Sequence, residues 1–114
     1  MKIEKINDKI VYNDNSISKR LIFNEGKVLN FMLNLKPGQG VPPHTHESSD
    51  LVIYIVEGDQ GELIADDKTS LVSKGDVIHC YGTEMFSLKN TGNSNMACFC
   101  IIAPNPSQIY SKEF

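Results

Sequence analysis

The strongest constraint on the fold of this chain is a succession of short apolar stretches separated by turn residues. In residues 27–35, every second position (29, 31, 33 and 35) holds leucine or phenylalanine. A period of two is typical of a β-strand and does not fit a helix. No segment shows the i, i+3, i+4, i+7 apolar spacing of a substantial helix. The pattern therefore predicts an all-β protein.

Other stretches of the same kind follow one another at short intervals. Turn signals such as Glu57-Gly58-Asp59 and Asn90-Thr91-Gly92 separate them. Strands are expected at 51–56, 62–65, 69–72, 77–80, 86–88 and 96–103, with weaker candidates at 2–6, 9–13 and 16–23. Eight or more short strands in 114 residues predict one domain, residues 1–114, built as a sandwich or closed barrel.

Charge and composition exclude several classes of function. A net charge of −3 gives no basic surface for nucleic acid. The longest apolar runs, 51–56 and 96–103, are too short to cross a bilayer, and the first residues do not resemble a signal peptide. We expect a soluble cytoplasmic protein that binds neither nucleic acid nor membrane. Its three cysteines are expected to be buried thiols.

Two histidines stand at the entrance to the most β-like segment. His44 and His46 follow the stiff pair Pro42-Pro43, and on an extended backbone their side chains point the same way. Two such imidazoles can hold a metal ion, line a small-molecule pocket, or have no present role. Metal ligation needs further donors, and Asp50 is the nearest candidate.

The residues around these histidines resemble the first motif of the cupin superfamily. Gly38, five residues, His44-Thr45-His46 and a closing Gly58 match that motif, in which six residues separate a glutamate from the last glycine. Gly75 and Asn90 match the ends of the second motif. The resemblance covers residues 28–103 and implies an antiparallel jelly-roll, or double-stranded β-helix, barrel.

Two positions depart from the family pattern. The glutamate position holds Leu51, and the histidine position of the second motif holds Phe86. In metal-binding cupins these two positions complete the ligand set with the two histidines. The resemblance thus implies a pocket lined by His44, His46, Leu51 and Phe86, with half of its wall apolar.

The orientation of the strand after the histidines leaves two alternatives. With Asp50 inward, a carboxylate could join His44 and His46; with Leu51 inward, Asp50 faces solvent. The spacing to Gly58 favours Leu51 inward. Four other polar or aromatic residues are candidates for the site but are expected to lie in strands or loops away from it: His79, Glu84, Tyr54 and Tyr81.

Two functions therefore stay open. The first is a binding protein that holds a small organic ligand beside His44 and His46. The second is a metal-dependent enzyme, similar to cupin dioxygenases or isomerases, with iron, manganese, nickel or zinc on His44, His46 and water or Asp50. The resemblance also implies a homodimer, in which residues 2–23 are expected to lie at the interface.

Overall fold

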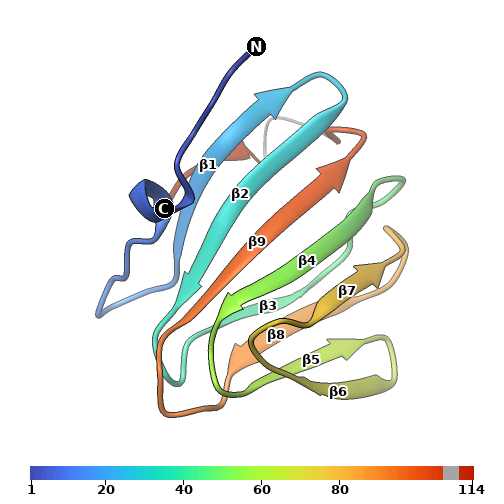
Figure 1. The fold of residues 1–114 in the computed structure, drawn as a ribbon. Coiled ribbons are helices and arrows are strands. Elements are labelled where there is room, and N and C mark those ends of the chain that lie inside the picture. Colours follow the sequence, from blue (N-terminus) through green and yellow to red (C-terminus); the bar gives the residue numbers. More distant parts are fainter. Residues whose placement is uncertain (107–110) are drawn as a thin grey trace.

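The architecture is two antiparallel sheets packed face to face, as the computed structural model of the chain shows (Figure 1). The structure describes residues 1–106 and 111–114. These residues form one short 3-10 helix, η1 (Ile6–Lys9), and nine strands: β1 (Ser18–Glu25), β2 (Val28–Leu35), β3 (Gly40–His44), β4 (Asp50–Glu57), β5 (Gly61–Ala65), β6 (Lys68–Val72), β7 (Val77–Cys80), β8 (Phe86–Asn90) and β9 (Met96–Ala103). The all-β antiparallel jelly-roll prediction is confirmed.

The strand order explains why residues far apart in sequence meet in the interior. The larger sheet has the order β1-β2-β9-β4-β7, and the smaller has the order β3-β8-β5-β6. Both motif segments contribute to both sheets: β3 and β4 belong to the first motif, β7 and β8 to the second. The inner faces of the two sheets enclose the core and the candidate site.

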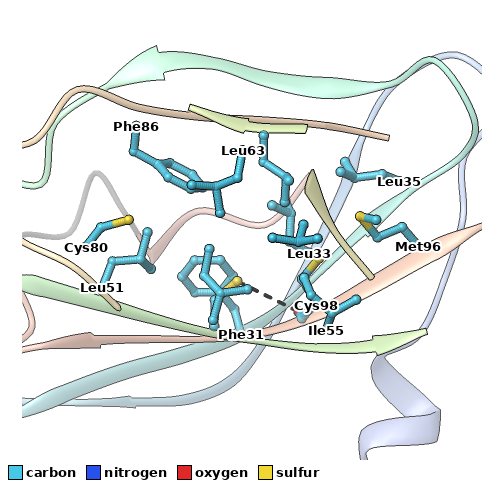
Figure 2. Packing of buried hydrophobic residues seen from close by; sticks show 14 of the residues in the cluster. Phe31, Leu33, Leu35, Leu51, Ile55, Leu63, Cys80, Phe86, Met96 and Cys98 are labelled. Atoms are coloured by element: carbon cyan, nitrogen blue, oxygen red, sulfur yellow. Dashed lines mark hydrogen bonds between the residues drawn. The ribbon is translucent and has the colours of Figure 1, made fainter. Parts of the chain in front are cut away.

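Alternation decides which residues of a strand join the core between the sheets, although β2 is buried along nearly its whole length. On β2, positions 29, 31, 33 and 35 belong to the hydrophobic core, as the period of two predicts. Figure 2 shows Phe86 and Leu63 of the smaller sheet facing Leu51 and Phe31 of the larger one. The three cysteines are buried free thiols, as expected, and burial raises the pKa of each.

The prediction of strands at 2–6 and 9–13 is wrong. Residues 1–17 contain η1 but no strand, and most of them are exposed. The polar residues in this segment favour local hydrogen bonds over a ladder: the Asn15 amide donates to Asn13 Oδ1 at 2.9 Å. The placement of residues 2–23 at a homodimer interface stays a prediction.

Across the described part of the chain, no helix is long and apolar enough to cross a membrane. The end labelled C in Figure 1 lies beside β1. There the Lys19 amide donates to the Phe114 carbonyl at 2.7 Å, and the Phe114 amide donates to the Lys19 carbonyl at 3.2 Å. This pairing brings Phe114 next to the site described below.

Candidate functional site

A cavity of about 220 Å³ lies between the two sheets. Its walls are mostly apolar, and the side chains come from both sheets. The apolar lining includes Phe31, Leu33, Leu51, Ile53, Phe86 and Ile102, and the polar lining includes Lys19, His44 and His46. A mostly apolar cavity with a few convergent polar groups is typical of a small-molecule site.

His44 is positioned by β3, an edge strand of the smaller sheet. Proline is tolerated there because an edge strand leaves part of its backbone without ladder partners. The pairing of β3 with β8 shifts register between Val41 and His44, so that His44 lies opposite Phe86. The His44 ring packs edge-on against the Phe86 ring, with the ring centroids 5.7 Å apart.

His46 is positioned by the tight turn that follows β3. Its amide donates to the Gly82 carbonyl at 2.9 Å, and its carbonyl accepts from the Ser49 amide at 3.1 Å. A Cβ atom at Gly82 would lie 2.3 Å from the carbonyl oxygens of both Glu47 and Ser49. Glycine at position 82 therefore allows the turn to pack closely enough to bury His46, which is 3% exposed.

The two imidazole rings contact each other directly. Their centroids are 4.6 Å apart, and the two Nε2 atoms are 3.0 Å apart. His44 Nδ1 lies 2.8 Å from the Pro42 carbonyl, which can only accept, so this network assigns the hydrogen to Nδ1. A neutral His44 then accepts at Nε2, and His46 donates from its own Nε2.

His46 is held neutral at physiological pH. Burial lowers its pKa to about 4, with smaller contributions from His44 and Lys19. A neutral His46 adds no positive charge to the cavity, and in this network the N–H group of each ring already donates within the protein.

The positions where metal-binding cupins have a glutamate and a second-motif histidine face the same cavity. Leu51 is 2% exposed and Phe86 is 3% exposed, and both line the cavity wall. Asp50, one residue before Leu51, faces away from the cavity. On the outer face its Oδ2 lies 2.9 Å from His79 Nε2. The structure thus brings together His44, His46, Leu51 and Phe86, but not Asp50.

The other candidate residues lie outside the cavity lining. Tyr54 and Tyr81 are exposed, and the Tyr81 ring packs against His79. Glu84 closes a turn by accepting from the Tyr81 amide at 2.7 Å.

Lys19 and Phe114 are among the lining residues that sequence reasoning did not assign to the site. Lys19 lies between Ile17 and Leu21, two partly buried apolar residues packed on the core. That alternation was the available signal for an inward-facing lysine. Phe114 gave no signal, because only the pairing with β1 brings it to the cavity.

The residues present do not fit a metal site of three or four protein ligands. Such sites take at least three donors, and the histidine pair supplies two. Leu51 and Phe86 offer no donor atom. Among residues 1–106 and 111–114, no group of three or more histidine, cysteine, aspartate or glutamate side chains could hold an ion.

Solved structures with the same fold cover nearly the whole chain. A protein of Thermus thermophilus is 25% identical, with a TM-score of 0.85 over 91% of this chain and 98% of that one. An uncharacterized double-stranded β-helix protein of Klebsiella pneumoniae is 14% identical, with a TM-score of 0.86 over 94% of each chain. A predicted oxalate decarboxylase of Thermotoga maritima is 25% identical, with a TM-score of 0.63 over 82% of this chain and 98% of that one.

Sequence comparison gives the family directly. No curated protein matches the chain. The family model described as the cupin domain matches residues 31–102, which is more than half of the chain and includes both histidines and the positions of Leu51 and Phe86. The chain belongs to the cupin domain family.

Proposed function

We propose that this cupin binds a small organic molecule in the cavity between its sheets. The observation that carries this proposal is the composition of one cavity wall: a hydrogen-bonded histidine pair beside Leu51 and Phe86. The imidazoles orient a polar group of the ligand, while the apolar side chains remove its body from water.

The ligand is expected to be small. A cavity of about 220 Å³ compares with the roughly 150 Å³ engineered cavity that binds benzene in another protein. A single ring or a branched aliphatic group with one short polar substituent is of the matching size.

Fragment binding, followed by NMR on the full ¹⁵N-labelled chain, tests the proposal. We expect fragments of one ring to shift the amide signals of residues around the cavity, including His46, Ile53 and Phe86. Ile53→Phe should weaken this binding at least tenfold, because Ile53 lines the cavity. The matched control is Ile55→Phe, which enlarges a buried side chain of the same strand that is not in the lining. Equal binding by both variants, or no binding by wild type, would contradict the proposal.

A metal-dependent enzyme is the second candidate. The observation that favours it is the convergence of the two Nε2 atoms at 3.0 Å. Similarity to a predicted oxalate decarboxylase gives a small carboxylic acid as a candidate substrate class. In this case water or substrate would have to supply the donors that Leu51 and Phe86 lack.

Metal analysis separates the two candidates. The protein is purified without a histidine tag and incubated with iron, manganese, nickel or zinc, and its metal content is measured. Stoichiometric metal that is lost in the double variant His44→Ala/His46→Ala would favour the enzyme. Absence of bound metal after each incubation would exclude it.

A further inference from the structure

A lysine side chain faces the interior of the barrel beside the histidine pair. Lys19 is 7% exposed, pairs with Leu33 in the β1–β2 ladder, and lines the cavity. Lysine is almost never so deeply buried without an electrostatic reason. Its place on β1 follows from alternation, because Ile17 and Leu21 on the same face pack on the core.

Two aromatic rings lie near the ammonium group of Lys19. Lys19 Nζ lies 4.5 Å from the centroid of Phe31 and 5.7 Å from that of Phe114. Both rings also line the cavity. Cation–π contacts offset part of the cost of removing the charge from water, and burial still lowers the pKa of Lys19. The position of Lys19 on β1 and its contacts with these two rings therefore keep its ammonium group at the cavity wall.

No acidic side chain of the described residues lines the cavity, although the chain carries a net charge of −3. The titratable side chains of the lining within the described residues are Lys19, His44, His46 and Cys100. Burial keeps His46 and the Cys100 thiol neutral at physiological pH. Lys19 therefore sets a positive potential inside a low-dielectric space, which favours an anionic group on the ligand.

We propose that the ligand is a small monocarboxylate with an aromatic or branched apolar body, whose carboxylate accepts a charge-assisted hydrogen bond from Lys19 Nζ. The apolar body packs against Leu51, Phe31 and Phe86, which line the cavity. This inference rests on the proposed function, since it assigns the ligand class of the same cavity. The proposed ligand differs from oxalate, which has two carboxylates, because the apolar half of the cavity wall has no polar partner for a second carboxylate.

Matched probes test the role of charge. Phenylacetate and phenylacetamide have nearly the same shape and differ in charge, so calorimetric titration of the full chain with each isolates the contribution of the cation. We expect wild type to bind phenylacetate at least tenfold more tightly than phenylacetamide. Oxalate, which lacks an apolar body, is expected to bind more weakly than phenylacetate.

Two lysine variants test whether the preference for phenylacetate depends on Lys19. Lys19→Met keeps the apolar stem but removes the charge, and it should abolish the preference for phenylacetate while phenylacetamide still binds. The matched control Lys27→Met removes an exposed lysine and should keep the wild-type ratio. If Lys19→Met does not fold, Lys19→Gln and the ratio of the two affinities in wild type decide the question.

The outcomes separate this inference from the proposed function. Equal affinities for both probes, or an unchanged ratio in the folded Lys19 variant, would overturn the carboxylate assignment and leave the cavity as a site for neutral ligands. Tighter binding of oxalate than of phenylacetate would overturn the inference that the ligand has an apolar body. Absence of binding by either ring compound would overturn this assignment, and the proposed function would fail only if the fragment experiment also showed no binding.

Discussion

The two histidine-containing pairs of this protein lie in opposite environments. His44 and His46 hydrogen-bond to each other inside the barrel, whereas His79 lies beside Asp50 on the outer face, where their side chains are 44% and 51% exposed. Alternation on β4 is the cause, because it sends Leu51 inward and Asp50 outward. The interior imidazoles therefore lack the carboxylate that a neighbouring position in sequence could have supplied. If Asp50 faced the interior in place of Leu51, a carboxylate would lie in the cavity beside the two imidazoles; with Leu51 inward, that part of the wall is apolar.

The largest effect on stability is expected when the two metal-ligand side chains of metal-binding cupins are restored at positions 51 and 86. In Leu51→Glu/Phe86→His, a buried carboxylate and imidazole replace two apolar side chains, which should lower the free energy of unfolding by about 3–5 kcal/mol. Zinc or nickel should recover most of this loss by binding the four side chains. Urea unfolding with and without metal measures both effects.

The matched control places a carboxylate elsewhere in the core. Leu63→Glu, in β5, should be as destabilising, and metal should not recover it, because Leu63 does not line the cavity. Failure of metal to stabilise the double variant would contradict the interpretation of the histidine pair as half of a ligand set.

The interior pair should also make stability depend on pH through His46. Its pKa is about 4 in the folded protein and 6.5 when exposed, so the unfolded state binds more protons between these values. The free energy of unfolding therefore falls as pH falls from about 7 to 4, by about 2–3 kcal/mol from this residue.

Urea unfolding of wild type and His46→Gln at pH 7, 5.5 and 4 measures this contribution. Carboxylates titrate in both proteins and cancel in the difference. The variant should lose less stability on acidification, while Lys27→Gln should keep the wild-type dependence. Parallel pH profiles for wild type and His46→Gln would show that burial does not hold His46 neutral.

The smallest effect is expected from the outer pair. Asp50→Asn should lower the free energy of unfolding by less than about 1 kcal/mol, because solvent weakens a contact between two exposed polar side chains. It should leave fragment binding in the cavity unchanged. Urea unfolding and the NMR titration check these expectations, with Asp67→Asn as an exposed control. A loss of ligand affinity in Asp50→Asn alone would mean that the outer pair is coupled to the cavity.

Most of the fold could be predicted from local patterns. Period-two alternation predicted β2, and apolar runs predicted β4 and β9, to within one residue at each end. The N-terminal strands at 2–6 and 9–13 were predicted wrongly because a few isolated apolar residues mimic alternation without a partner strand to pair with.

The candidate site could be predicted in part. The spacing of His44 and His46 predicts neighbouring rings, and the rings are in contact. The distance to Gly58 favours Leu51 over Asp50 as the inward residue, and Leu51 is buried. Lys19 was missed because lysine is normally exposed, so its place in the alternation of β1 carried little weight.

Local patterns in the sequence were enough to predict most of the strands and the alternation of side chains within each of them. Side-chain alternation is a local property of the backbone, so Leu51 and Phe86 replace polar ligands whatever the rest of the chain does. The tertiary structure alone decided that Lys19, Phe114 and the histidine pair share one cavity, and that His79 meets Asp50 outside it. Those contacts depend on strand order and register, which bring together segments that are far apart in the chain and leave no trace in local spacing.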